Sequence, residues 1–136
     1  MKVGITIGCF DLFHRGHENL IDTIRDTNDR VICLVHDNKS IFENKNVHVH
    51  DALNVRMNNA RKYGVDVVVP VFDKDPSGIL RNILAVIGNE HEIEFIRGND
   101  WTDFPGKNIL DEYDIPITFI PYTEGVSSTK LRNLRS

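Results

Sequence analysis

Short apolar runs alternate with amphipathic stretches along the 136-residue chain. Each run is compact and is followed by polar or glycine-containing sequence, which is typical of strands buried in a parallel sheet. Five such strands are predicted, over residues 3–8, 30–36, 65–72, 93–101 (running into a loop at its end) and 116–122. Periodicity between the strands predicts helices from Gly16 onward and over residues 51–64, 75–89 and 127–135.

The helix over residues 51–64 carries clear boundary signals, because Asp51 is an expected N-cap and Gly64 an expected stop. The segment before it, residues 37–50, is polar and has no steady period. That segment is therefore predicted to be a long loop, and loops of this length in a compact domain are often functional.

The alternation of strands and helices determines the predicted fold class. Strands that are apolar on both faces predict an α/β protein with a Rossmann-like, doubly wound, parallel five-stranded sheet and helices on both faces. Repeats, low-complexity stretches and linkers are all missing from the sequence, so residues 1–136 are predicted to form a single domain.

Composition narrows the class of protein further. Apolar residues make up 40% and charged residues 26% of the chain, which is typical of a packed domain. The net charge of −4 argues against nucleic acid as a main partner, since proteins that bind its phosphate backbone usually present a basic face. The apolar runs are too short for a bilayer span or a signal peptide, so no membrane association and a cytoplasmic location are expected.

Polar residues gather where three of the predicted strands end. The stretches are GCFDLFHRGH at residues 8–17, RGNDW at 97–101 and TEGVSST at 123–129. Ligands of open parallel sheets bind outside the carboxyl ends of the strands, so these stretches are expected to meet in one crevice. The pattern favours a nucleotide or another phosphorylated ligand.

Two histidines, His14 and His17, surround Gly16 where the first helix is predicted to begin. Free backbone N–H groups and the positive end of the helix dipole are expected to face the crevice there. Two imidazoles in this place can donate hydrogen bonds to phosphate oxygens and stabilise charge in a transition state. A metal site, an acid/base pair, or plain capping and packing are the alternatives.

A zinc site requires a third protein ligand, and the sequence has no Cys-x-x-Cys or His-Glu-x-x-His pattern, although Cys9 and Asp11 are near. Cys9 ends an apolar strand, so a small buried side chain is a simpler interpretation than a nucleophile. Cys33 also lies in an apolar run, and no disulfide framework is predicted.

The other two stretches each allow two interpretations. Ser127, Ser128 and Thr129 cap the last helix, and they also stand where hydroxyls reach phosphate oxygens. Asp100 either receives a hydroxyl of the ribose or base, or closes a turn after Gly98.

GCFDLFHRGH, RGNDW and YTEGVSSTK together resemble, in order and spacing, the HxGH cytidylyltransferases, and most closely the small bacterial glycerol-3-phosphate cytidylyltransferases. The resemblance covers essentially the whole chain. It implies the nucleotidyltransferase fold and transfer of CMP from CTP to a phosphorylated alcohol, with glycerol 3-phosphate favoured. Pyrophosphate would leave after in-line attack without a covalent intermediate. Mg²⁺ is implied as the companion of the nucleotide, and a homodimer as the assembly.

The resemblance also implies roles for individual residues. The catalytic set is His14, His17 and Lys45, with Lys39 as the alternative lysine. The nucleotide-binding set is Gly8, Cys9, Phe10, Gly16, Arg56, Gly98, Asp100, Thr123, Gly125, Ser127, Ser128 and Thr129. The substrate-binding set is Asp11, Asp66, Arg97 and Trp101.

Four positions depart from the family pattern. Cys9 stands where Thr or Ser is usual, Tyr122 where a phosphate-binding Arg is usual, and Asn99 where the closest relatives have Asp. Arg97 stands where the family commonly has an uncharged residue or histidine. A hypothesis follows that Arg97 supplies the charge that tyrosine cannot replace.

The acceptor and the base of the nucleotide are less well specified. Trp101 matches a tryptophan of the glycerol-phosphate enzymes, whereas residues 72–78 do not match them, so a different polyol phosphate or phosphoalcohol stays open. H-x-G-H binds triphosphate and says little about the base, so an ATP-using adenylyltransferase is an alternative. A nucleotide-binding module without turnover is a further alternative, because Tyr122 stands where the family has a phosphate-binding arginine.

Overall fold

The computed structural model describes residues 1–98 and 104–121, which contain five strands and five helices. In chain order they are β1 (Lys2–Gly8), α1 (Arg15–Thr27), β2 (Arg30–His36), α2 (Asn38–Lys45), α3 (Leu53–Lys62), β3 (Val67–Val71), α4 (Ser77–Ile87), β4 (Glu92–Gly98), α5 (Lys107–Glu112) and β5 (Ile117–Ile120). Several predictions lie outside the described residues: those for Asn99, Asp100, Trp101, Tyr122, Thr123, Gly125, Ser127, Ser128, Thr129 and the helix over 127–135.

The five strands form one sheet in the order β3-β2-β1-β4-β5, and every neighbouring pair is parallel. The chain builds outward from β1 to β3, then crosses to the other side of β1 and builds outward through β4 and β5. This order confirms the doubly wound prediction. It also places the switch point, where such folds bind ligands, between the carboxyl ends of β1 and β4.

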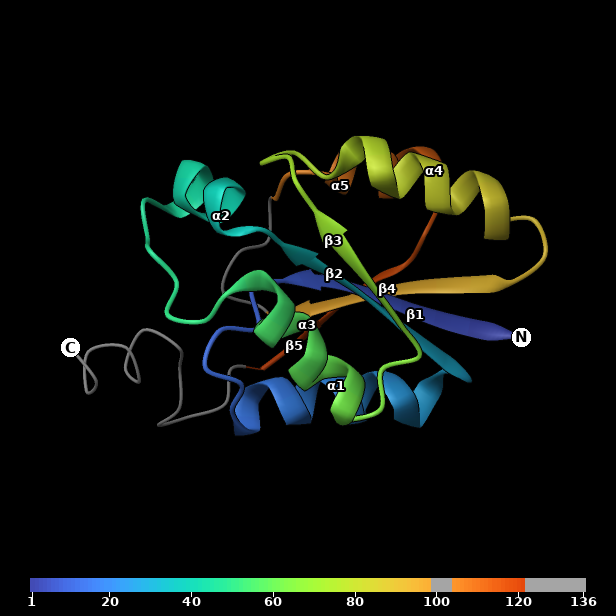
Figure 1. Ribbon diagram of the computed structural model, residues 1–136. Coiled ribbons are helices and arrows are strands. Elements are labelled where there is room, and N and C mark those ends of the chain that lie inside the picture. The colour runs from blue at the N-terminus through green and yellow to red at the C-terminus, as the bar shows by residue number, and fades with distance from the viewer. Residues whose placement is uncertain (99–103, 122–136) are drawn as a thin grey trace.

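Helices cover both faces of the sheet, with α1 and α3 on one face and α4 and α5 on the other (Figure 1). Each face has its own apolar core. Ile21 of α1 and Met57 of α3 belong to one cluster, and Leu80 of α4 and Leu110 of α5 to the other. Gly4 of β1 lets α1 approach the sheet, because a Cβ there would collide with Ile24.

The prediction of a long loop over residues 37–50 was wrong in its first half. Asp37 caps α2, its Oδ1 accepting a hydrogen bond from the Ser40 backbone N–H at 2.9 Å. The helix ends at Lys45, and its C-cap Asn46 has φ of +53°. Only Ser40 and Ile41 of α2 are buried. A helix that buries so little has a short apolar stripe, which is why no period is visible in the sequence.

The prediction that Asp51 caps α3 was also wrong. Ala52 occupies the N-cap and makes no side-chain capping bond. The Asp51 carboxylate instead accepts a hydrogen bond from the Leu12 backbone N–H at 3.2 Å and lies 2.8 Å from His50 Nδ1. Helix α5 had no counterpart among the predicted elements. Among the described residues, no helix is long and apolar enough to cross a membrane.

Candidate functional site

The two histidines form the N-terminal cap of α1. His14 is the N-cap residue, and its Nδ1 accepts a hydrogen bond from the Gly16 backbone N–H at 3.0 Å. His17 reaches back, and its Nδ1 accepts from the His14 backbone N–H at 3.1 Å. This reciprocal pair is a capping box in which histidines replace the usual hydroxyl and carboxylate side chains. The two rings stack with centroids 3.9 Å apart. We call His14 and His17 the histidine cap.

The capping bonds determine where each ring carries its proton. A neutral imidazole that accepts a hydrogen bond at Nδ1 holds its proton on Nε2. Burial, with a smaller contribution from the nearby His14, lowers the pKa of His17 to about 3, although Asp11 partly offsets the shift. Burial also lowers the pKa of His14. Both rings are therefore neutral at pH 7, and each carries its proton on Nε2.

The cap changes one expectation about anion binding. The Gly16 N–H donates to the His14 ring, and the His17 N–H donates to the His14 carbonyl at 3.0 Å. These two backbone donors are thus used within the protein and are not open to a phosphate. At this helix start the positive end of the dipole remains, together with the Nε2–H groups of the two rings.

Aromatic side chains fix the plane of the His17 ring. Phe13 stacks on it with centroids 5.3 Å apart, and Phe10 lies at 5.4 Å in a tilted arrangement. Phe10 is buried and has φ of +55°, so its role as a nucleotide-binding residue would fall to its backbone. The supporting role of Phe13 was not predicted.

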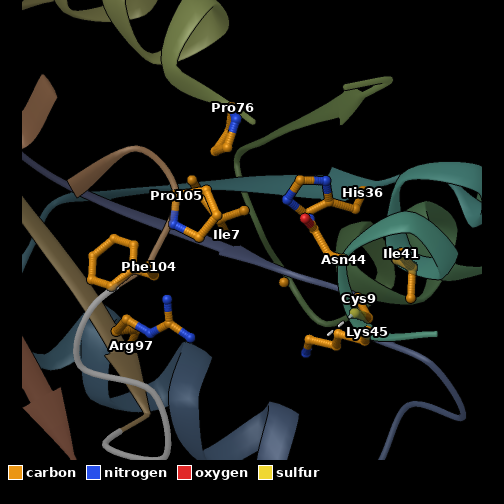
Figure 2. A pocket seen from close by; sticks show the side chains of 11 residues that line it. Ile7, Cys9, His36, Ile41, Asn44, Lys45, Pro76, Arg97, Phe104 and Pro105 are labelled. Atoms are coloured by element: carbon orange, nitrogen blue, oxygen red, sulfur yellow. Dashed lines mark hydrogen bonds between the residues drawn. The ribbon is translucent and has the colours of Figure 1, made fainter. Parts of the chain in front are cut away.

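A pocket opens at the switch point, on the α4–α5 side of the sheet (Figure 2). The residues that line it come from the ends of three strands, from α2, from the start of α4 and from the segment before α5. They are Ile7, Gly8, Cys9, His36, Ile41, Asn44, Lys45, Pro76, Arg97, Phe104 and Pro105. The ends of β1 and β4 thus meet at one edge of the sheet, as the topology requires.

Two cations reach into this pocket, Lys45 from α2 and Arg97 from β4. Lys45 Nζ lies 3.9 Å from Cys9 Sγ. The Arg97 guanidinium carbon lies 4.3 Å from the centre of the Phe104 ring, a cation–π contact. The lining residues that the structure describes include these two cations and no carboxylate. We call it the cation pocket. Lys39, the alternative lysine, does not line it.

Arg56 is not placed as a phosphate ligand. Its side chain is fully buried, and the guanidinium donates to the carbonyl oxygens of Asp51 (3.1 Å), Cys9 (2.8 Å) and His36 (2.7 Å) and to the Asn38 side chain. Burial lowers its pKa, and neighbouring acidic groups partly restore it. Arg56 therefore holds the ends of β1 and β2 in position.

The two acidic residues predicted to bind substrate lie in different places. Asp11 is buried beneath the loop before α3, where its carboxylate accepts from the backbone N–H groups of His50 and Asp51, both at 2.9 Å. Such a carboxylate orders the loop. Asp66 lies at the opposite edge of the sheet, and its Oδ2 accepts from the N–H of Val31, near the start of β2, at 2.9 Å. The structure thus does not bring Asp66 to the pocket.

His36 and Asn44 line the pocket although neither was predicted to do so. Burial lowers the pKa of His36, with smaller contributions from Lys45 and Arg56, so its ring is neutral at pH 7. Its place at the carboxyl end of a predicted buried strand was the signal that could have identified it. Asn44 donates through Nδ2 to the Lys74 carbonyl at 2.8 Å.

A doubly wound sheet with a histidine-capped helix and a cationic pocket at its switch point is an arrangement that suits a phosphorylated ligand. Comparison with known sequences identifies the family. Residues 5–134 match the family described as cytidylyltransferase-like, and the chain belongs to this family.

Two relatives share about 30% of their aligned residues with this chain. Glycerol-3-phosphate cytidylyltransferase of Bacillus spizizenii is 30% identical over 135 residues, which cover 97% of this chain and 95% of that protein. The bifunctional protein HldE of Nitrosococcus oceani is 28% identical over 131 residues, 93% of this chain. The chain spans about a quarter of the length of HldE, since the match covers 26% of it.

Solved structures share the fold. TmcAL of Thermotoga maritima, bound with alpha-thio ATP, superposes with a TM-score of 0.67 at 17% identity, covering 98% of this chain and 50% of that one. The lipopolysaccharide core biosynthesis protein of Thermoplasma volcanium gives a TM-score of 0.63 at 16% identity, covering 89% and 95%.

Proposed function

We propose that this protein transfers CMP from CTP to a small phosphorylated alcohol, with glycerol 3-phosphate as the favoured acceptor, and releases pyrophosphate. The observation that carries the proposal is the histidine cap. It places two imidazoles with Nε2–H donors at the positive end of α1, after the carboxyl end of β1, where the cation pocket also opens. The likeness to glycerol-3-phosphate cytidylyltransferase over nearly its full length supports the choice of nucleotide and acceptor.

The proposed reaction is a direct displacement at the α-phosphorus of CTP. A phosphate oxygen of the acceptor forms a bond to that phosphorus while the bond to the bridging α–β oxygen breaks, and pyrophosphate takes the electron pair. The attacking oxygen is already ionised, so no general base is required. The histidine cap donates its Nε2–H groups to the charge that develops on the phosphate oxygens, and such donors each contribute about 10²–10³ in kcat.

Mg²⁺ belongs with the nucleotide in this proposal. It would neutralise the triphosphate and its developing charge. The lining residues of the pocket, so far as the structure describes them, offer no carboxylate, and both oxygens of Asp11 accept backbone hydrogen bonds. This donor set fits an ion held through phosphate oxygens and water, a common arrangement for Mg²⁺.

The test is pyrophosphate release in the presence of Mg²⁺. CTP and ATP are each offered with glycerol 3-phosphate, with other polyol phosphates and with phosphocholine. Release with CTP and glycerol 3-phosphate is expected. Faster release with ATP would move the assignment to adenylyl transfer, and binding of CTP without release from any pair would support a module without turnover.

The matched variants are His17→Asn and His17→Ala. Asparagine places an acceptor close to the position of Nδ1, so it keeps the bond from the His14 N–H and removes the Nε2–H donor. Both variants are expected to lose turnover. Equal loss in the two would assign the effect to the missing donor, whereas full activity in His17→Asn would contradict the proposed role of the histidine cap.

A further inference from the structure

We propose that His36 is a specificity-determining residue: its ring Nε2 accepts a hydrogen bond from a hydroxyl group of the phosphorylated alcohol, so the protein favours polyol phosphates. The inference rests on the nucleotidyl transfer proposed above and names a residue that recognises the acceptor. Figure 2 shows the starting observation, which is that the His36 ring extends from the end of β2 into the pocket.

Ser40 determines which nitrogen of the His36 ring carries the proton. The Ser40 hydroxyl lies within hydrogen-bond distance of three oxygens that can only accept: the Asp37 carboxylate (2.5 Å) and the carbonyls of Asp37 (3.2 Å) and Val71 (3.3 Å). A hydroxyl has one proton, which is donated to one of these oxygens. His36 Nδ1 lies 3.2 Å from the same Ser40 oxygen and meets its lone pairs, so Nδ1 is the donor of this hydrogen bond.

The other ring nitrogen of His36 is therefore an acceptor. Burial lowers the pKa of His36, and Asp37 and the backbone of Asp73 oppose this shift without reversing it, so the ring holds a single proton at pH 7. Among the described residues, Ser40 is the one hydrogen-bond partner of the ring. With the proton on Nδ1, Nε2 at the tip of the ring has a free lone pair.

His36 and the histidine cap thus present opposite chemistry to a ligand. His14 and His17 accept at Nδ1 and carry their protons on Nε2, which suits phosphate oxygens. An ionised phosphate oxygen would meet the lone pair of His36 Nε2 and be repelled, whereas a hydroxyl donates to it. We therefore expect His36 to face the uncharged part of a substrate.

Asn44 places a second acceptor in the same pocket. Its Nδ2 donates to the Lys74 carbonyl at 2.8 Å, and a carbonyl can only accept, so Oδ1 is the atom left for a ligand. Both side chains line the pocket, and Figure 2 shows Asn44 extending toward the His36 ring. Two neighbouring acceptors match the two hydroxyls of a polyol such as glycerol 3-phosphate.

The alternation of side chains along β2 places His36 on the side from which the acceptor approaches. Ile32 and Leu34 belong to the core beneath α4 and α5, and side chains two residues apart share a face, so His36 lies on that face. The histidine cap packs on Phe10, a member of the core on the α1–α3 side. In-line displacement places the attacking oxygen opposite the leaving pyrophosphate. With pyrophosphate at the cap, the acceptor approaches from the face that carries His36.

The first experiment reads the tautomers directly, by ¹H–¹⁵N NMR correlation of the histidine rings in the whole protein at pH 7. His36 is expected to show Nδ1–H, whereas His14 and His17 show Nε2–H. His36→Phe identifies the His36 signals. Ser40→Ala removes the lone pairs that hold the Nδ1 proton and should shift His36 toward Nε2–H. An Nε2–H form of His36 in the unchanged protein would overturn the inference.

The second experiment compares kcat/KM for glycerol 3-phosphate with that for propyl phosphate, which has the same carbon chain and phosphate but no hydroxyl. Glycerol 3-phosphate should be favoured about 5- to 30-fold, as for hydrogen bonds to neutral acceptors. His36→Phe keeps a ring and removes the acceptor, so it should abolish most of this preference. Its activity with propyl phosphate should stay within about twofold, which also shows that the variant is folded. The control His48→Phe changes an exposed histidine that does not line the pocket and should keep the preference.

Two kinetic outcomes would contradict the role of His36. Equal loss of activity with both acceptors in His36→Phe would mean that the residue only shapes the pocket. A raised KM for CTP with an unchanged KM for glycerol 3-phosphate would place the group that meets His36 on the nucleotide.

The two proposals fail in different ways. If no pair of substrates releases pyrophosphate, nucleotidyl transfer fails, while calorimetry without CTP would still support the hydroxyl site if His36 is needed for glycerol 3-phosphate to bind more tightly than propyl phosphate. If turnover is normal but propyl phosphate serves as well as glycerol 3-phosphate, the function stands and the role of His36 is wrong.

Discussion

The histidine cap and the cation pocket both lie where the proposed nucleotidyl transfer needs positive potential, but they are built in opposite ways. The cap is made within four consecutive residues, because His14 and His17 satisfy each other across the first turn of α1. The pocket is made from residues as far apart as Ile7 and Pro105. Local hydrogen bonds are sufficient to form the histidine cap, whereas the cation pocket depends on strand register and on the buried Arg56.

The largest expected effect is on the region that depends on long-range contacts. Arg56→Met would leave the carbonyls of Cys9, His36 and Asp51 without their donor and should cost about 3–5 kcal/mol of unfolding free energy. Urea denaturation measures this. The control Arg61→Met should change stability by less than about 0.5 kcal/mol. A stable Arg56→Met protein with a raised CTP KM would mean instead that Arg56 contacts phosphate.

His14→Asn tests the local region. Asparagine is a good N-cap, so the helix should stay stable, whereas His14→Ala should cost about 1 kcal/mol. Both variants remove the Nε2–H and should lower kcat about 10²- to 10³-fold. Thermal unfolding and steady-state kinetics give the two readouts. If stability and kcat both fell in His14→Ala and neither fell in His14→Asn, the Nε2–H of His14 would have no role in turnover.

Acid should weaken the histidine cap before other parts of the protein. His17 has a folded pKa of about 3, below its ordinary value of 6.5, so between these values the unfolded chain binds a proton that the folded protein does not. Stability should therefore fall by about 1–2 kcal/mol between pH 7 and pH 5. The fall should be shallower in His17→Asn, and equal slopes in both proteins would contradict the shifted pKa.

Asp66→Asn should have the smallest effect. Asp66 lies at the edge of the sheet opposite the pocket, and asparagine keeps an oxygen for the Val31 N–H. Stability should change by less than about 0.5 kcal/mol, and KM for CTP and for glycerol 3-phosphate should not change. A raised KM would mean that Asp66 does contribute to substrate binding.

The predictions agree with the structure where an element depends on contacts near in the sequence, and they differ where it depends on distant contacts. Residues 30–36 form a strand within the predicted bounds because the apolar run is continuous. Helix α2 was not predicted, because only two of its residues are buried and its apolar period is too short to see. His36 and Asn44 belong to no sequence motif. His36 ends β2, whereas the place of Asn44 in the pocket depends on how α2 packs beside the strand ends.

The sequence by itself determined the doubly wound sheet, the edge at which ligands bind and the helix start that carries His14 and His17, since these depend on periodicity and on contacts between near neighbours. Only the tertiary structure decided which polar residues line the pocket and which pair with the backbone. Arg56, Asp11 and Asp66 resemble binding residues in sequence, yet each pairs with backbone groups distant in the chain. A charged side chain takes its role from the partners that folding brings to it, and those partners are set by strand register and helix packing.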